Sequence, residues 1–369
     1  MMEWHMFELA PIVTPLLEWF DGHARVLPWR EEPTPYRVWI SEIMLQQTRV
    51  EAVKPYFERF MLALPNVEAL ANVEEDRLLK LWEGLGYYNR ARNLQKAARL
   101  VVELYGGELP NEVSLLLQLP GIGSYTAGAI ASIAYQKPFP AVDGNVLRVI
   151  ARVIADRQDV LNQSVKKQYE EAVLAVIPKD RPGAFNQALM ELGAMVCVPN
   201  GMPRCEECPW KSFCKARELD CIAELPHKAK KKPRMIEEKT ILLIQDEKKV
   251  AIRKRPKKGL LAGLYEFPAL EGIQTREAAI QYVEELGFKA IHVKELERSK
   301  HIFSHKEWHM IGYAIRVDEL SRPDGDANLQ GFELIETSKT EESYPIPAAF
   351  MAYTRYLNIK LGNSKFQKE

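Results

Sequence analysis

The spacing of apolar residues predicts two regions of different structure. Up to about residue 222, apolar residues recur every three or four positions, which is typical of amphipathic helices. Gly or Pro separates most of these segments, so the helices are expected to be short. The clearest helical segments cover residues 35–47, 50–64, 91–106, 145–154 and 166–177.

Beyond residue 237 the pattern changes to strands with few helices. Residues 240–245, 249–255, 288–293 and 301–317 are predicted strands, residues 275–286 a helix, and Pro347 to about Leu361 a final helix. Between the two regions, residues 228–234 hold five basic residues and a proline, which is typical of an exposed connector. We therefore expect an all-α domain over 1–222, a basic linker over 223–236 and a smaller α+β domain over 237–369.

Composition narrows the class of protein. The 369 residues are 47% hydrophobic and 27% charged, which excludes a disordered chain. Fifty basic and fifty acidic residues give no net charge, so binding of nucleic acid would depend on a local basic face. The sequence lacks a long apolar run and the marks of a signal peptide, so we expect no membrane contact and a cytoplasmic location.

Four of the five cysteines are clustered, which indicates a metal site. Cys197, Cys205, Cys208 and Cys214 are separated by seven, two and five residues, and Cys221 is left over as a spare thiol. In a reducing compartment such a cluster favours metal ligands over disulfides. Zinc is one alternative, but zinc ribbons usually bring together two separated C-x2-C pairs. One short loop with a single pair suits an iron–sulfur cubane better.

Residues 112–135 suggest two short helices joined by a glycine turn. The first helix is expected to end at Pro120, Gly121 and Gly123 to flank the turn, and the second helix to begin at Ser124. Glycines allow close backbone approach, and the unpaired N–H groups of the second helix suit a phosphate. This is the design of a helix-hairpin-helix DNA-binding element. A helical hairpin whose glycines serve only the turn is the alternative.

Two carboxylates are candidates for catalysis, and each has a structural alternative. Asp143 precedes a helical segment, where an aspartate is usually an N-cap. The capping N–H groups would also keep it ionised, so that it could stabilise a cation. Glu42 precedes the apolar residues 43–45, and its alternative is an ordinary place on the exposed face of a helix.

Two further segments carry side chains suited to DNA. Gln46, Gln47 and Thr48 are consecutive uncharged hydrogen-bonding residues, which suit base edges better than a salt-bridged helix surface. Residues 84–93 join a glycine-rich turn and two tyrosines to two arginines, a combination that can enter a base stack while holding phosphate. Aromatic core contacts at a helix end would leave the same pattern.

A histidine repeat later in the chain does not indicate a metal site. His301, His305 and His309 recur at every fourth residue, but their apolar and aromatic neighbours favour a strand. On a strand, residues four apart lie about 13 Å apart, too far to share one ion.

Taken together, these motifs resemble the endonuclease III superfamily of DNA glycosylases, and within it the adenine DNA glycosylases of the MutY type. The resemblance covers the whole chain and rests on long motifs. They are LPWR (27–30), SEIMLQQT (41–48), WEGLGYYNRARNL (82–94), LPGIGSYTAGAI (119–130), AVDGNVLRV (141–149) and FNQALMELGAMVC (185–197).

The resemblance implies hydrolysis of the N-glycosidic bond of adenine mispaired with 8-oxoguanine or guanine in duplex DNA, as a step of base excision repair. It implies that Glu42 is the general acid and that Asp143 stabilises the sugar cation. Tyr125 and Asn145 would support Asp143. Lyase members of the superfamily carry a lysine where this chain has Tyr125, so a monofunctional enzyme without a Schiff base is expected.

The resemblance also implies the binding residues and the cofactor. The residues implied for the adenine pocket are Trp29, Arg30, Leu45 and Gln187, and the residues implied to replace the flipped base and touch its partner are Gln47, Thr48, Leu85 and Tyr87. The oxidised base would be recognised by Phe303, Ser304 and His305, and the DNA backbone would be bound at Gly121 and Gly123. One 4Fe-4S cluster would have as its ligands Cys197, Cys205, Cys208 and Cys214. The family commonly has six residues between the first two cysteines, where this chain has seven.

The second domain is similar to Nudix domains in its order of strands and helix. A working Nudix hydrolase needs an R-E-x-x-E-E-x-G core, but Ile280 and Gln281 stand where its first Arg and Glu would be. We therefore expect a lesion-recognition module without diphosphatase activity. The resemblance further implies a monomeric, nucleoid-associated bacterial protein that binds double-stranded DNA. A bifunctional lyase and a zinc-stabilised mismatch binder are the competing hypotheses.

Overall fold

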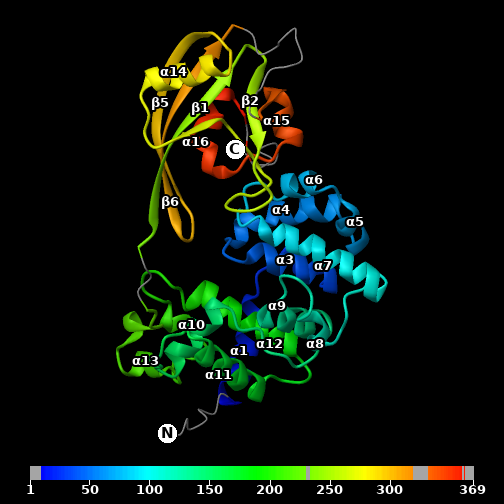
Figure 1. Ribbon diagram of the computed structural model, residues 1–369. Coiled ribbons are helices and arrows are strands. Elements are labelled where there is room, and N and C mark those ends of the chain that lie inside the picture. The colour runs from blue at the N-terminus through cyan, green and yellow to red at the C-terminus, as the bar shows by residue number, and fades with distance from the viewer. Residues whose placement is uncertain (1–9, 230–232, 319–330, 360, 362–369) are drawn as a thin grey trace. The chain divides into compact units, whose positions relative to one another are not determined.

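The structure, a computed structural model, describes residues 10–229, 233–318, 331–359 and 361. The chain divides into two compact units (Figure 1). One contains Met1–Asn72 and Asn93–Lys231, and the other contains Val73–Arg92 and Lys232–Glu369. The second unit thus includes a segment from the region that the sequence predicts as the helical domain.

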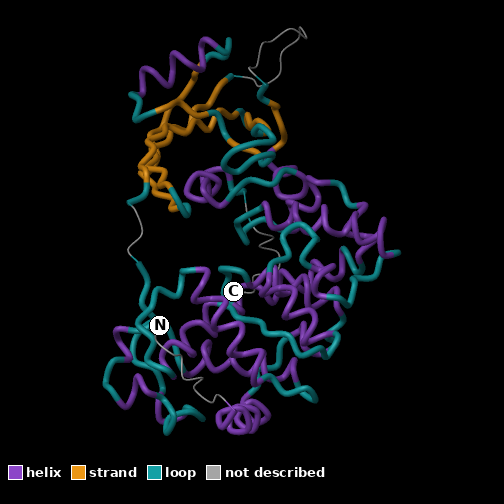
Figure 2. The backbone as a smooth tube through the Cα atoms, turned by 60° about the horizontal axis from the view of Figure 1, so that its bottom comes forward, coloured by secondary structure: helices purple, strands orange, loops and turns teal. Residues whose placement is uncertain are grey.

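The first unit is helical, and the strands lie in the second unit (Figure 2). Two helices of the first unit continue as π-helical turns, η1 (Ile130–Ala134) and η2 (Leu192–Val196). Its helices are α1 (Ala10–His23), α2 (Pro28–Glu31), α3 (Pro35–Leu45), α4 (Val50–Ala63), α5 (Val67–Asn72), most of α7 (Asn89–Tyr105), α8 (Val113–Leu116), α9 (Ser124–Ala129), α10 (Gly144–Val153), α11 (Gln163–Val176), α12 (Pro182–Glu191) and α13 (Lys215–Glu218).

Helix α3 is buried on nearly all sides. Thr34 caps its N-terminus by accepting a hydrogen bond from the N–H of Arg37, and Pro35 occupies the first turn, where its missing N–H costs nothing. Residues 36 and 38–44 are all buried, and the helix packs against α4, α9 and η1. A residue on any face of this part of α3 is therefore withdrawn from bulk water.

The core of the first unit joins segments that are far apart in the sequence. Apolar residues of α1, α10, α11 and α12 form one cluster, which also includes Trp210 of the cysteine loop. The indole N–H of Trp210 donates to the carbonyl of Ile12, 2.8 Å away. Because Trp210 is almost fully buried, the cysteine loop is fixed to the same core that supports α10.

The helix-hairpin-helix expected at residues 112–135 is present as α8, a turn and α9. The second helix begins at Ser124, as predicted, but the first ends at Leu116, before Pro120. Gly121 has φ +81°, and a Cβ there would lie 2.8 Å from Cβ of Asn93. Gly121 therefore serves the turn, while a Cβ on Gly123 would meet open space.

The second unit is built on a sheet with the strand order β3-β2-β1-β6-β5, to which β4 and β7 are added through β1 and β2. β1 and β6 are parallel, and the other pairs are antiparallel. The strands are β1 (Met235–Gln245), β2 (Lys249–Lys254), β3 (Tyr265–Glu266), β4 (Ala269–Glu271), β5 (Ala290–Ile302), β6 (Lys306–Val317) and β7 (Glu333–Glu336).

Both faces of this sheet are covered. Ile241 and Leu243 of β1 belong to a cluster with the C-terminal helical segments, and Leu242 and Ile244 belong to a second cluster with α14 (Arg276–Glu285). The alternation follows from the two-residue period of a strand. The predicted final helix is present as three consecutive short helical segments, Ala348–Phe350, Met351–Thr354 and Arg355–Leu357. It ends before Leu361, because Asn358 adopts a left-handed conformation with φ +53°.

Within the second unit, a buried ion pair attaches segment 73–92 to the residues near the C-terminus. Nζ of Lys80, on α6 (Glu75–Leu81), lies 2.9 Å from Oε2 of Glu83 and donates to the carbonyl of Thr340. Oε1 of Glu83 accepts from the N–H of Ile346 at 2.8 Å. Because both side chains are buried, this pair fixes the segment to α15 (Thr337–Ser343) and the residues after it.

Candidate active site

A pocket of about 760 Å³ opens in the first unit, within the usual size range of ligand sites. It is lined by residues from α2, α3, the loop after α3, α9, α10 and α12. The predicted residues that line it are Trp29, Arg30, Glu42, Leu45, Gln47, Thr48, Tyr125, Asp143, Asn145 and Gln187. Glu42 and Asp143, which are about a hundred residues apart in the sequence, therefore share one cavity.

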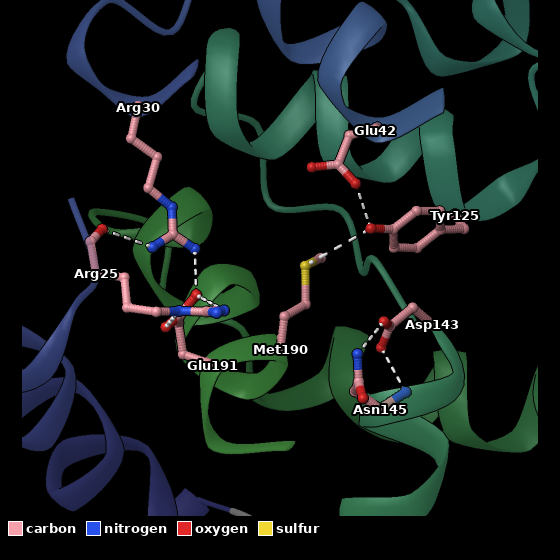
Figure 3. A network of polar contacts seen from close by, with 8 residues as sticks. All are labelled: Arg25, Arg30, Glu42, Tyr125, Asp143, Asn145, Met190 and Glu191. Atoms are coloured by element: carbon pink, nitrogen blue, oxygen red, sulfur yellow. Dashed lines mark hydrogen bonds and ion pairs between the residues drawn. The ribbon is translucent and has the colours of Figure 1, made fainter. Parts of the chain in front are cut away.

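Glu42 is a buried carboxyl group and not an exposed helix residue. Only 5% of it is exposed, and the hydroxyl of Tyr125 donates a hydrogen bond to its Oε2 (Figure 3). Burial raises the pKa of Glu42 to about 7, and the negative charge of Asp143 acts in the same direction. The hydrogen bond from Tyr125 and the charge of Arg30 oppose this rise in pKa.

Asp143 is the N-cap of α10, as the sequence suggested. Its Oδ1 accepts hydrogen bonds from the backbone N–H groups of Asn145 and Val146, at 2.9 and 2.8 Å. Its Oδ2 accepts a third from the side-chain amide of Asn145 at 2.8 Å (Figure 3). The pKa of Asp143 is raised, because the effect of burial exceeds the opposite effect of these three donors and the charge of Arg148. The carboxylate is thus held in one orientation.

The hydroxyl of Tyr125 donates to Glu42 and lies 3.7 Å from the sulfur of Met190 (Figure 3). The resemblance implies a supporting role for Tyr125 beside Asp143, and the charge of Asp143 does act on the Tyr125 phenol. Desolvation and the negative charges of Glu42 and Asp143 raise the pKa of this half-buried phenol well above the usual value, so it stays a donor. Asn145, in contrast, contacts Asp143 as expected.

Arg30 is held by a carboxylate that sequence reasoning missed. Its Nη2 donates to Oε1 of Glu191 at 2.9 Å, and Arg25 makes two hydrogen bonds to the same carboxylate, at 2.7 and 2.8 Å (Figure 3). Glu191 is almost fully buried. It follows Gln187 by one helical turn on α12, so the four-residue spacing could have placed both on one face.

The loop after α3 also borders the pocket. Gln47 is exposed and has φ +59°, a conformation that non-glycine residues seldom adopt. Thr48 is half-buried. Their side chains are thereby presented beside the cavity that contains Glu42.

The other predicted DNA-contacting loops lie in the second unit. Leu85 is 7% exposed and Tyr87 is 49% exposed, in a turn where Tyr87 has φ +47°. Arg90 donates from Nη2 to the carbonyls of Leu85 and Gly86 and lies over the ring of Tyr87. This turn is therefore held by the arginine that follows it.

Phe303, Ser304 and His305 form the turn between β5 and β6, so the predicted strand over 301–317 is interrupted at this point. Phe303 makes edge contacts with the rings of His301 and Trp308, with centroids 4.6 and 4.9 Å apart. Ser304 and His305 are exposed. The aromatic contacts give the turn a rigid base, while its tip remains accessible.

The four clustered cysteines line one small cavity. Cys197, Cys205, Cys208 and Cys214 all border it, whereas Cys221 does not and is buried beside Leu225 in a small apolar cluster against which Cys214 also packs. Within the described ranges, no three His, Cys, Asp or Glu side chains are placed to hold a single metal ion. The thiols thus surround a space instead of meeting at one point.

Helix α10 connects this cavity with Asp143. Nη1 of Arg152 lies 3.3 Å from Sγ of Cys197, and Arg148 donates from Nε to the carbonyl of Cys197 at 2.8 Å. Nη2 of Arg148 donates to Oδ1 of Asn145 at 2.9 Å. The residue that holds Asp143 is therefore itself held by an arginine bound to the cysteine loop.

Comparisons with known proteins show the family and the two domains of the chain. Residues 40–175 match the HhH-GPD superfamily of base excision DNA repair proteins, and residues 240–355 match the NUDIX domain. The human protein named adenine DNA glycosylase is 36% identical over 82% of this chain and 67% of its own length. The protein of that name from Buchnera aphidicola subsp. Acyrthosiphon pisum is 34% identical, over 83% of this chain and 87% of its own.

Solved structures agree on the fold. A thermostable thymine-DNA glycosylase superposes with a TM-score of 0.52 and 30% identity, over 57% of this chain and 96% of its own. An endonuclease III trapped as a covalent intermediate with DNA gives a TM-score of 0.50 at 24% identity, over 58% of this chain and 98% of its own. No helix in the described part of the chain could cross a membrane. The chain belongs to the MutY-type adenine DNA glycosylases of the helix-hairpin-helix superfamily, and it is a DNA N-glycosylase with an appended Nudix-like domain.

Proposed function

We propose that this protein removes adenine paired with 8-oxoguanine or guanine from double-stranded DNA, by hydrolysis and without cutting the strand through a Schiff base. The observation that carries the proposal is that Glu42 and Asp143 line one pocket, the first with a raised pKa and the second held by three hydrogen-bond donors. An acid and a fixed carboxylate are the pair that glycosidic bond cleavage requires.

The pocket suits a nucleoside turned out of the duplex. Flipping costs a few kcal/mol, and least at a mismatch. Trp29 offers an aromatic wall, and the amide of Gln187 can both donate to and accept from the adenine edge. Arg30 reaches the same space while its ion pair with Glu191 fixes its direction.

Glu42 is proposed as the general acid. With a pKa of about 7, it keeps a proton near neutral pH that it can deliver to N7 of adenine, which makes the base a better leaving group. The resulting carboxylate can then take a proton from the attacking water. The hydroxyl of Tyr125 donates to Glu42 and stabilises that charged state.

Asp143 is proposed to stabilise the sugar as its bond to the base breaks. The transition state has oxocarbenium character, so an anion near the sugar lowers its energy. The three hydrogen bonds from Asn145 and Val146 prevent the carboxylate from turning away. Tyr125 offers no amine for attack on the sugar, which supports base removal alone.

Three loops are proposed to contact the mispair. Gln47 and Thr48 beside the pocket, and Leu85 with Tyr87 in the second unit, would fill the space left by the adenine and contact its partner. The turn at Phe303, Ser304 and His305 is proposed to recognise the oxidised guanine. Gly121 and Gly123 of the hairpin are proposed to face the DNA backbone, Gly121 by forming the turn and Gly123 by leaving open space beside it.

Cys197, Cys205, Cys208 and Cys214 are proposed to hold one 4Fe-4S cluster. Four thiols around one cavity, with Arg152 beside Cys197 to balance thiolate charge, fit that group. When bound, the cluster would cross-link residues 197–214 through its iron–thiolate bonds. The seven residues between the first two cysteines are accommodated by a turn in which the N–H of Arg204 donates to the carbonyl of Val196.

The test is single-turnover release of adenine from duplexes that differ only in the base opposite it. Release should be fastest opposite 8-oxoguanine or guanine, slower opposite thymine, and abolished in Glu42→Gln and Asp143→Asn. Full activity in either variant would refute the assignment of that residue. Borohydride trapping of the wild-type protein on DNA would show a lyase instead.

A further inference from the structure

A lysine from the basic connector lines the active-site pocket. Lys228 borders the same cavity as Glu42, Asp143 and Asn145, although the sequence places it in a segment expected to serve only as a connector. All of these residues belong to the first unit. The start of the connector is thus part of the site.

The backbone before Lys228 is fixed to helix α10 and its neighbours. Leu225 is buried, and its carbonyl accepts a hydrogen bond from Nε of Arg152 at 3.0 Å. The carbonyl of His227 accepts another from the N–H of Val160 at 3.2 Å. Lys228 directly follows these anchors, and Asp143 caps the helix that carries Arg152. The position of Lys228 beside the pocket is therefore determined by these hydrogen bonds and by the burial of Leu225.

Most cations around the pocket already have partners. Arg25 and Arg30 bind the buried carboxylate of Glu191, and Arg148 serves Asn145 and backbone carbonyls. For Arg49 and Lys228, in contrast, the described residues provide no ion pair or side-chain hydrogen bond. Both side chains are exposed. Two positive charges at this pocket are thus available to an anion from outside the chain.

A flipped nucleotide supplies such an anion. When its base enters the pocket, the sugar and the phosphates on either side of it stay outside. An ammonium group is a compact charge that suits a phosphate and needs no fixed geometry. Lysines that attack sugars are desolvated, whereas Lys228 is exposed. We infer that Lys228 binds a backbone phosphate of the strand that carries the flipped adenosine, which rests on the proposed function of this pocket.

The experiment measures binding of the full chain to a duplex with adenine opposite 8-oxoguanine, at a series of salt concentrations. The Asp143→Asn background prevents consumption of the duplex. Lys228→Ala should lower the slope of log K against log salt by about 0.9, because one phosphate contact is lost. Lys228→Arg should keep the slope. Lys167→Ala, which removes an exposed lysine that is paired with Glu171 and does not line the pocket, is the matched control.

A slope for Lys228→Ala equal to that of the Lys167→Ala control would overturn the inference. A borohydride-trapped adduct that forms with the active protein and disappears in Lys228→Ala would also overturn it, because the amine would then act as a nucleophile. Binding does not depend on adenine release. A protein that shows the slope difference but releases no adenine would therefore refute the proposed function and support this inference.

Discussion

The phenol of Tyr125 donates a hydrogen bond to Oε2 of Glu42, and this contact joins the hairpin helix α9 to the buried helix α3. It favours the ionised form of Glu42, whereas burial favours the protonated form, and burial has the larger effect. The balance leaves a carboxyl group that titrates near neutral pH.

The rate of adenine release is expected to fall as pH rises through about 7, because Glu42 then loses the proton it must deliver. Tyr125→Phe removes a contact that lowers this pKa, so the fall should move to higher pH. Single-turnover rates between pH 5 and 9 measure this. Tyr169→Phe, in the core around α11, is the control and should keep the wild-type profile. A fall that moved to lower pH in Tyr125→Phe would contradict the assignment.

Glu42 should also make stability depend on pH. Its pKa is raised from 4.5 to about 7 in the folded state, so the unfolded chain loses this proton first and stability declines as pH rises between these values. Glu42→Gln removes this decline. Its melting temperature relative to wild type should therefore be higher at pH 8 than at pH 5. If the difference in melting temperature between Glu42→Gln and wild type were the same at pH 5 and pH 8, the carboxyl group of Glu42 would not be desolvated.

Asp143 allows the capping and chemical roles to be separated. Asn is about as good an N-cap as Asp, so Asp143→Asn should leave the melting temperature nearly unchanged while reducing the single-turnover rate by at least ~10²-fold. Asp143→Ala should lose the same activity and, in addition, about 1 kcal/mol of stability. Thermal unfolding and adenine release measured on the same samples test both. An active Asp143→Asn variant would leave capping as the whole role of this residue.

The cysteine assignments predict a contrast within one set of substitutions. Cys205→Ser should lose iron, sulfide and the visible absorption of the protein, and its melting temperature should fall because residues 197–214 lose their cross-link. Cys221→Ser should keep the iron, the sulfide and the visible absorption, since Cys221 lies outside the cavity. Metal analysis and absorption spectra give the result. A colourless wild-type protein that contains zinc would contradict the cluster.

The ion pair of Lys80 and Glu83 should matter more than surface pairs. Lys80→Met leaves a buried carboxylate without its cation and should cost about 3–5 kcal/mol. Adding Glu83→Gln should cost less than the sum of the two single changes. Lys54→Met, at the exposed pair with Glu51, should cost less than about 1 kcal/mol. Denaturant unfolding of the wild type, Lys80→Met, Glu83→Gln, the double variant and Lys54→Met provides the comparison, and additive effects would argue against a coupled pair.

Features of the site that depend on neighbouring residues could be predicted from the sequence. Asp143 was expected as an N-cap and is one, because its partners are the N–H groups of the next two or three residues. The start of the second hairpin helix at Ser124 was likewise predicted from the glycine turn before it. The predicted end of the first helix at Pro120 was wrong, since the helix ends at Leu116 and no residue there marks the start of the turn.

Long-range packing decided the rest. The pattern around Glu42 fits a half-exposed helix equally well, and burial of α3 on nearly every side turned this residue into a carboxyl group that titrates near pH 7. That Glu42 and Asp143 share a pocket, and that Lys228 of the connector borders it, depends on contacts between distant segments. The composition and spacing of residues determine local hydrogen bonds, whereas desolvation and the meeting of side chains exist only once the helices have packed.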